Sequence, residues 1–245
     1  MELLRVSPQS PRAWKAAIDA VASFLSEATF HFTERGVWLQ ALDPSMVVFV
    51  VMEAPRDVFR EYVLKHPEVR VPVSMGEFQR ILSRLSGGDR LIIRFSSTNL
   101  YVLMEGGGIR KEFVLPAINI EESNTVVTMP ESLSYVKIPA QYLKEALKNA
   151  SIVSNTVVFR VENDKFIVEA REGSNVSRTE ISPSPGVKIV YDSPTVSRYS
   201  IAYLQNILKG SDGEVTLEMS TDGPLKVSYS VEGIRLTFIL APLIL

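Results

Sequence analysis

Hydrophobic and polar residues follow two periods along this chain, that of an α-helix and that of a β-strand. Helical spacing recurs four times, in segments that contain Trp14, Phe78, Leu143 and Leu204, and the apolar side chains of each segment share one face. Strand alternation is clearest in "LKVSYSV", which begins at Leu225. Turn sequences such as "TERG", "ENDK" and "TDGP" separate the strands. The pattern predicts an α+β fold with four helices and many short strands.

The polar faces of the predicted helices carry mostly bases. The apolar faces are Trp14, Ala17, Ile18, Val21 and Leu25; Phe78, Ile81, Leu82 and Leu85; Leu143, Ala146 and Leu147; and Leu204, Ile207 and Leu208. The bases on or beside the opposite faces are Arg12, Lys15, Arg80, Arg84, Lys144, Lys148 and Lys209. With three acids among them (Asp19, Glu77 and Glu145), these segments have a net charge of +4, whereas the whole chain has −2. Solvent-facing helices are commonly charged, but four of the same sign in an acidic chain favour salt-dependent, sequence-independent phosphate contacts.

The chain contains an internal repeat. Phe78 aligns with Leu204 and Pro116 with Pro242, and both pairs are 126 residues apart, while upstream segments align at a spacing of 129 residues. Helix, turn, strand, turn and strand follow in the same order in both copies, so a duplicated domain is expected. We predict domains at residues 1–116 and 138–245, joined by a linker at residues 117–137, which has no helical period.

Composition excludes several classes of protein. The 245 residues are 46% hydrophobic and include no cysteine, so thiol nucleophiles, disulfides and thiolate metal sites are absent. No signal peptide or apolar run long enough for a membrane span is recognisable, so a cytoplasmic, nucleoid-associated protein without membrane contact is expected. The two histidines, His31 and His66, have no metal-ligand spacing, and strand and loop positions are expected for them.

No catalytic constellation emerges from the sequence. Asp43, Glu53 and Asp192 occur singly, and "EGGGIRKE" lacks the spacing of a phosphate-binding loop and precedes a predicted strand, so a hairpin turn is expected there. We therefore expect no enzymatic activity, no cofactor and no metal.

Two long segments carry a family resemblance. "FLSEATFHFTERGVWLQALDPSMVVFVVM" and "DGPLKVSYSVEGIRLTFILAP", together with the duplication, resemble the archaeal DNA sliding clamps of the proliferating cell nuclear antigen (PCNA) family. The resemblance implies two DNA-clamp domains, each of paired βαβββ units. It also implies a ring of three subunits around duplex DNA, with helices inside and sheets outside, and the function of a processivity factor for DNA polymerase.

The resemblance also implies functional positions. Lys15, Arg80, Lys148 and Lys209 match basic positions of the ring interior, whereas Arg12, Arg84 and Lys144 rest on helical placement alone. Polymerase, flap endonuclease, DNA ligase and clamp loader would dock at matching apolar positions, namely Leu42, Met46, Val47, Val127, Met129, Pro130, Pro224, Ile239, Ala241 and Pro242.

Subunits of that family join by edge strands. The corresponding segments here would pair Ile109, Lys111 and Phe113 of one subunit with Val176, Arg178 and Glu180 of the next. A homotrimer and a heterotrimer with sister subunits both remain open. A checkpoint-type clamp or a non-encircling DNA-binding saddle is the alternative function, and the role of the apolar end, Leu243 to Leu245, is open.

Overall fold

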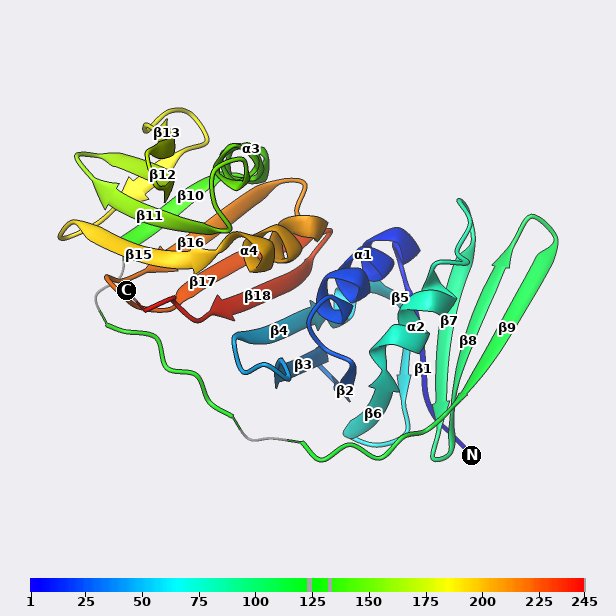
Figure 1. The fold of residues 1–245 in the computed structure, drawn as a ribbon. Coiled ribbons are helices and arrows are strands. Elements are labelled where there is room, and N and C mark those ends of the chain that lie inside the picture. Colours follow the sequence, from blue (N-terminus) through cyan, green and yellow to red (C-terminus); the bar gives the residue numbers. More distant parts are fainter. Residues whose placement is uncertain (123–124, 132–133, 245) are drawn as a thin grey trace. The chain divides into compact units, whose positions relative to one another are not determined.

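The computed structural model describes residues 1–122, 125–131 and 134–244, which form two compact units (Figure 1). Unit 1 comprises Met1–Pro44, Val50–Thr125 and Val231–Leu236, and unit 2 comprises Ser45–Phe49, Val126–Ser230 and Thr237–Leu245. Leu245, part of the apolar end considered above, lies outside the described residues. Among these residues no helix has the length and apolar character that a membrane crossing needs.

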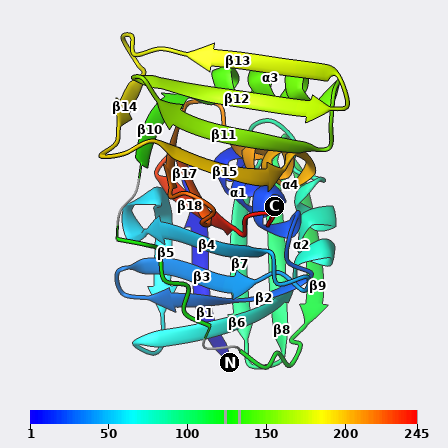
Figure 2. The same cartoon turned by 60° about the vertical axis from the view of Figure 1, so that its left-hand side comes forward.

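Unit 1 contains two sheets and two helices. Its elements are β1 (Glu2–Pro8), α1 (Pro11–Ala22), β2 (Glu27–Thr33), β3 (Gly36–Leu42), β4 (Val48–Pro55), the 3₁₀ turn η1 (Arg56–Val58), β5 (Phe59–Leu64), β6 (Glu68–Ser74), α2 (Met75–Leu82), β7 (Arg90–Ser96), β8 (Asn99–Gly106) and β9 (Ile109–Pro116). One sheet has the order β5-β1-β7-β8-β9, and the strands β4, β3, β2 and β6 lie side by side in the other (Figure 2). The recorded pairs are antiparallel.

The core of unit 1 explains why its helices lie beside each other. The Trp14 ring of α1 is 6.1 Å from Phe30 in β2 and 5.5 Å from Phe59 in β5, measured between ring centroids. Phe78 of α2 meets the same Phe30 at 6.2 Å. Each buried aromatic ring removes a large apolar surface from water, so the shared contact fixes both helices on one layer of the unit.

Unit 2 repeats this plan. Its elements are β10 (Ser134–Pro139), α3 (Ala140–Ser151), β11 (Thr156–Glu162), β12 (Lys165–Glu172), β13 (Asn175–Ile181), β14 (Lys188–Val190), β15 (Thr195–Ser200), α4 (Ile201–Ile207), the 3₁₀ turn η2 (Leu208–Gly210), β16 (Glu214–Met219), β17 (Leu225–Val231) and β18 (Ile234–Leu240). The strands β13, β12, β11 and β15 form one sheet, and β14, β10, β16, β17 and β18 are neighbours in the other (Figure 2). In the core of unit 2, the ring centroid of Phe159 lies 5.1 Å from that of Phe166 and 5.5 Å from that of Tyr199.

The observed elements confirm the α+β fold of two similar domains. Both units run β, α, three strands, one further strand, then β, α and three strands. α2 and α4 begin 126 residues apart, at Met75 and Ile201, and α1 and α3 begin 129 residues apart, at Pro11 and Ala140. These are the spacings of the sequence repeat. β10 begins at Ser134, inside the range assigned to the linker.

Local chemistry sets the helix ends, and three helices end earlier than the sequence pattern indicates; α1 ends at Ala22, before Leu25. Ser10 caps α1 because its Oγ accepts a hydrogen bond from the Ala13 N–H at 3.2 Å, with proline in the first turn. α2 ends at Leu82, so Arg84 and Leu85 lie in the following turn. The Arg84 N–H bonds to the Ile81 carbonyl at 2.9 Å, a tightened i to i−3 bond that closes the helix before two glycines. Lys209 lies on η2, beyond the end of α4 at Ile207.

The glycine-rich segment "EGGGIR" forms a hairpin turn, as the sequence predicts. β8 ends at Gly106 and β9 begins at Ile109. The two residues between them have positive φ angles, 58° at Gly107 and 78° at Gly108. Two residues of this conformation match the twist of paired strands, and glycine adopts it without steric cost.

Candidate nucleic-acid and partner interfaces

An ion-paired cluster joins the two helices of unit 1. The Lys15 Nζ lies 2.6 Å from the Asp19 Oδ2, one turn further along α1. The other Asp19 oxygen accepts a hydrogen bond from the Gln79 Nε2 of α2 at 3.1 Å. Asp19 therefore holds Lys15 and links α1 to α2, so the Lys15 charge is partly neutralised where it stands.

The other three predicted DNA-contacting cations of unit 1 are exposed arginines. Arg12 is exposed near the start of α1, and Arg84 is exposed in the turn after α2. The Arg80 side chain is 79% exposed and lies 4.0 Å from the Glu77 carboxylate, at the limit of an ion pair. For Arg12 and Arg84 the described residues include no carboxylate within ion-pair distance of the guanidinium. Such side chains can bind phosphate through charge, without reading bases.

Unit 2 shows the same division between a restrained and a free cation. Lys144 is half-buried on α3, and its Nζ donates to the backbone carbonyl of Ser211 in the turn after α4. Lys148 on α3 and Lys209 on η2 are exposed. Lys144 lies 129 residues after Lys15, so the same position of the repeat holds a tethered lysine in both units.

The predicted interface strands are edge strands of their sheets. β9 ends the order β5-β1-β7-β8-β9, and β13 ends the order β13-β12-β11-β15. Ile109 is 62% exposed and Val176 is 44% exposed, so each edge strand presents a large apolar side chain that a neighbouring strand can cover. Phe113 and Leu115 of β9 line an open pocket of about 310 Å³ together with Ile81 of α2.

Charged side chains hold both edge strands in place. The Lys111 Nζ of β9 lies 2.9 Å from the Asp89 Oδ2 and donates to the carbonyl of Arg84 at 2.9 Å, which ties β9 to the turn after α2. The backbone N–H of Ser86, followed by Lys111, lowers the pKa of Asp89 below its usual range. On β13, Arg178 bridges Glu169 at 3.2 Å and Glu180 at 2.9 Å.

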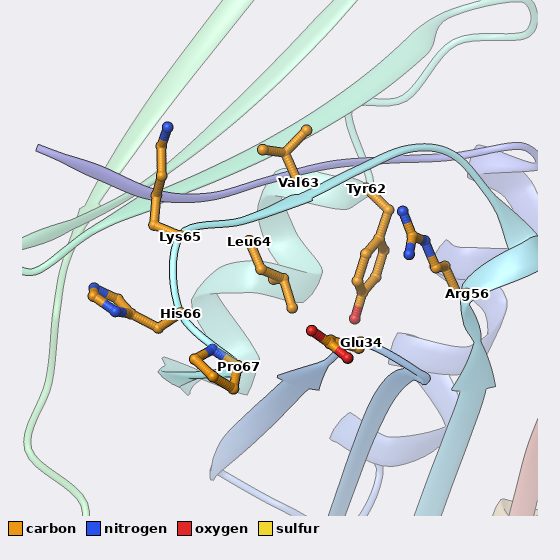
Figure 3. A pocket seen from close by; sticks show the side chains of 8 residues that line it. All are labelled: Glu34, Arg56, Tyr62, Val63, Leu64, Lys65, His66 and Pro67. Atoms are coloured by element: carbon orange, nitrogen blue, oxygen red, sulfur yellow. The ribbon is translucent and has the colours of Figure 1, made fainter.

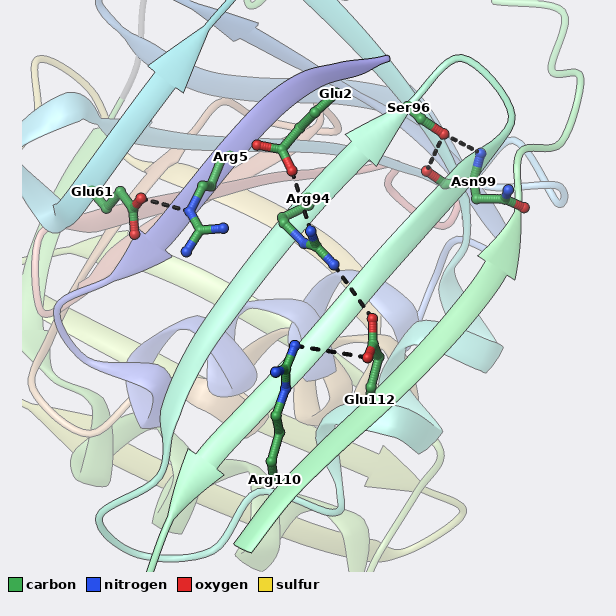
Figure 4. A network of polar contacts seen from close by, with 8 residues as sticks. All are labelled: Glu2, Arg5, Glu61, Arg94, Ser96, Asn99, Arg110 and Glu112. Atoms are coloured by element: carbon green, nitrogen blue, oxygen red, sulfur yellow. Dashed lines mark hydrogen bonds and ion pairs between the residues drawn. The ribbon is translucent and has the colours of Figure 1, made fainter. Parts of the chain in front are cut away.

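A ladder of ion pairs crosses the face of the β9 sheet (Figure 4). The Arg94 guanidinium of β7 lies 3.4 Å from Glu2 of β1 and 3.3 Å from Glu112 of β9. Its carbon lies 5.1 Å from the centre of the Tyr101 ring on the intervening strand β8. Arg110 reaches the same Glu112 at 3.8 Å. Arg94 thus connects β1, the second strand in the sheet order, with the edge strand β9.

Nine of the ten predicted docking residues belong to unit 2, and Leu42 belongs to unit 1. Met46 is 75% exposed, with a positive φ of 57°. The Ala241 N–H donates to the Val47 carbonyl at 2.9 Å, which brings two of the nine together. The exposed Leu243 donates its N–H to the carbonyl of Arg198 in β15 at 2.8 Å, so the backbone at Leu243 lies beside that strand.

The remaining predicted docking residues lie on the linker, on a turn, on the last strand β18 and, for Pro242, just after it. Val127, Met129, Pro224, Ile239 and Pro242 are half-buried, and Pro130 is exposed. Half-buried apolar side chains keep surface available for a further contact.

A pocket of about 440 Å³, which no sequence pattern indicates, lies at the β5–β6 connection (Figure 3). Tyr62, Leu64 and Glu34 are among its lining residues. The Tyr62 hydroxyl donates to the Thr33 carbonyl at 2.7 Å, and burial raises the pKa of Tyr62 to about 12. The phenol is therefore neutral at physiological pH and acts as a hydrogen-bond donor.

Sequence reasoning also missed three polar side chains that restrain predicted ones. Asp19 holds Lys15, Gln79 donates to Asp19, and Asp89 holds Lys111. Of these contacts, Lys15–Asp19 alone has a local signal, the i,i+4 spacing on a helix. His31 lies in β2 as expected, but its buried position between carboxylates was not anticipated.

Two similar α+β units, with cations on their helices and apolar side chains on edge strands, define the DNA-clamp class of folds. The family of the PCNA N-terminal domain matches residues 8–105. The DNA polymerase sliding clamps of Thermococcus gammatolerans and Pyrococcus furiosus are each 32% identical to this chain, over 92% of both chains. The structure of PCNA from Thermococcus kodakaraensis superposes with a TM-score of 0.92 and 26% identity, covering 98% of this chain and 100% of that one. The chain belongs to the PCNA family of DNA polymerase sliding clamps.

A further structure shares the fold. A. fulgidus PCNA, solved with the C-terminal region of FEN-1 bound, superposes with a TM-score of 0.90 over 99% of both chains, at 22% identity. At this identity the likeness concerns the fold of the subunit.

Proposed function

We propose that this chain is a subunit of a trimeric ring that encircles duplex DNA and tethers replication and repair enzymes without catalysing a reaction itself. The single observation that carries the proposal is the match to sliding clamps over 92% of the chain. In this proposal residues 1–116 and 138–245 are the clamp domains, residues 117–137 are the linker, and the protein works in the cytoplasm on the nucleoid.

The helix cations supply the contact with DNA. Arg12, Arg80, Arg84, Lys148 and Lys209 are exposed, whereas Lys15 and Lys144 are tethered within their own unit. Arginine and lysine bind phosphate oxygens regardless of sequence, and their contribution falls steeply with salt. A ring that must slide needs contacts of this weak and uniform kind.

The subunit contact joins two different edges. β9 offers Ile109 and Phe113, and β13 offers Val176 and the Arg178–Glu180 pair. Because the two surfaces differ, repeated contact must either close a ring or continue as a filament. A homotrimer and a heterotrimer with sister subunits satisfy this geometry equally.

Partner enzymes dock on the apolar residues of unit 2 and the linker. The half-buried side chains of Met129, Ile239 and Pro242 can each lose further apolar surface to a partner's anchor side chain. A. fulgidus PCNA has been solved with the C-terminal region of FEN-1, which supports the same kind of docking here. Polymerase, flap endonuclease, DNA ligase and the clamp loader are the proposed partners.

Retention on circular DNA tests the ring. The protein is loaded on a nicked circular plasmid, and half of the sample is then cut once before gel filtration. A ring stays on the circle and slides off the cut form, because its hold is topological. A linear DNA with both ends blocked by bound protein should restore retention. Equal retention on circular and free linear DNA would exclude encirclement and favour a DNA-binding saddle.

Light scattering tests the subunit contact separately. The wild-type chain of 27.3 kDa should give an assembly of three chains, either alone or with sister subunits. Phe113→Asp places a charge in the pocket beside Ile81 and should yield monomers. Tyr142→Asp, at an exposed aromatic side chain of α3, is the control for the added charge. A stable trimer of the Phe113 variant would show that β9 is not the contact.

A further inference from the structure

His31 lies between two carboxylates that come from different parts of unit 1. Its side chain is 6% exposed, and its Nδ1 is 2.8 Å from the Glu68 Oε1 of β6. Its Nε2 is 3.1 Å from the Glu122 Oε2, which belongs to the linker after β9. The imidazole stacks on the indole of Trp38 in β3, with ring centroids 3.9 Å apart and an angle of 7° between the planes.

The number of protons on the ring decides whether both contacts are hydrogen bonds. A neutral imidazole has one N–H, and an ionised carboxylate can only accept. Both His31 contacts are therefore satisfied only when the ring carries two protons and a positive charge. The stacked Trp38 also favours that state, because an aromatic face attracts a cation.

Loss of one proton would release Glu122 rather than Glu68. Glu68 has a second partner, the Arg70 Nε at 3.1 Å, and its pKa is lowered chiefly by the hydrogen bond to His31 and next by that to Arg70. In the described part of the chain, His31 is the one partner of the Glu122 carboxylate. The Glu122 side chain is 36% exposed. Water can thus replace the ring at Glu122, while the remaining N–H stays on Glu68.

The other elements around the ring add no further charge at contact distance in the described residues. β3 presents Trp38, and the flanking side chains on the same face of β2 are Thr29 and Thr33. The charged groups that face His31 are therefore Glu68 and Arg70 from β6 and Glu122 from the linker.

We propose that His31 is a proton-dependent attachment site that fastens the first half of the linker to the β2–β3–β6 surface through Glu122. The fastened state exists when the ring is charged and the carboxylates are ionised, and it is lost as rising pH removes the ring proton. Val127, the first predicted docking residue of the linker, follows five residues later. The attachment at His31 thus sets how freely the docking segment moves. This consequence rests on the proposed function, whereas the attachment itself does not.

NMR on the intact protein, free of DNA and partners, tests the attachment of the linker at His31. Imidazole ¹⁵N shifts report the charge of His31, and amide relaxation of residues 118–122 reports the order of the linker, at pH 5.5 and pH 8.5. Histidine ordinarily changes charge between about pH 5 and 8, while glutamate stays ionised above about pH 5. We expect a charged ring with an ordered segment at pH 5.5, and loss of that order together with the ring charge at pH 8.5.

Variants distinguish the attachment at His31 from general effects of pH on the linker. Glu122→Gln should give a mobile segment at both pH values, while the contact of the ring with Glu68 is kept. Glu121→Gln removes the same charge from the exposed neighbouring residue and should behave as wild type. A segment equally ordered at both pH values, or unaffected by Glu122→Gln, would overturn the proposal. Retention on nicked circular DNA is measured independently, so failure of the His31 attachment and failure of the proposed ring are distinguishable.

Discussion

Asp19 moderates the positive charge of the helix layer in unit 1, and its removal should strengthen the dependence of DNA binding on salt. The Asp19→Asn substitution takes away the partner that holds the Lys15 Nζ at 2.6 Å. The amide oxygen of asparagine can still accept the bond from Gln79, so the link between α1 and α2 is retained. The change therefore frees one lysine and raises the net charge of the layer by one.

The expected magnitude follows from counterion release. Each additional phosphate contact steepens the slope of log K against log salt by about 0.9 for duplex DNA. If Lys15 gains one contact, affinity should fall about threefold more than for wild type when salt rises from roughly 50 to 200 mM. The lost ion pair is about one-third exposed on both sides, so it should cost no more than about 1 kcal/mol, or a melting shift below about 4 °C.

Fluorescence anisotropy of a labelled duplex over a salt series measures the slope. Glu172→Gln, at an exposed position at the end of β12, gives the same change of net charge outside the helices and serves as the control. An Asp19→Asn slope equal to those of wild type and the control would refute the view that Asp19 restrains a DNA-contacting lysine.

Three further predictions concern the DNA contact, the docking surface and the stability of β13. Reversing charge at Arg80 and Lys148 together should weaken DNA association and loading at moderate salt while light scattering still shows the assembled form; undiminished loading would remove both from the DNA contact. Aspartate in place of Met129 and Ile239 should abolish stimulation of a polymerase without lowering DNA retention, and normal stimulation would mean that the docking surface lies elsewhere. The pKa of Glu180 is lowered by hydrogen bonds to its lysine and arginine neighbours, so its contribution to stability is present above the ordinary carboxyl range and disappears as pH falls through the lowered pKa. Glu180→Gln should therefore lower the melting temperature at pH 7, and the difference from wild type should shrink as pH falls through the lowered pKa; a difference that does not change with pH would assign the effect to packing.

The fold was largely predictable because its information is periodic. The repeat spacings of 126 and 129 residues reappear as the distances between equivalent helices, since a duplicated sequence with the same apolar pattern builds the same layers. Leu25 lies beyond the end of α1 yet is buried, so the apolar pattern identified its core role although the helix is shorter. Helix ends depend on single hydrogen bonds and are less visible in a pattern, as the early end of α2 shows.

Side-chain partners could be predicted only where they are close in sequence. The Lys15–Asp19 pair has helical spacing, whereas Lys144 reaches a carbonyl 67 residues away, a contact that needs the packing of α3 against the turn after α4. His31 depends on the register of β2 against β6 and on the path of the linker, neither of which a periodic pattern encodes. The sequence therefore identified the helix cations but not which of them are already engaged.

The tie between Lys111 and the turn after α2 makes that turn a place from which events at β9 can be observed. Gly87 lies in this turn, its φ is not positive, and a Cβ built there would meet nothing within 4 Å. Because the chain has no cysteine, Gly87→Cys would create the single thiol of the protein at a site that tolerates a side chain. A fluorophore attached there would report the docking of a neighbouring strand on β9 in real time, with no background labelling to remove.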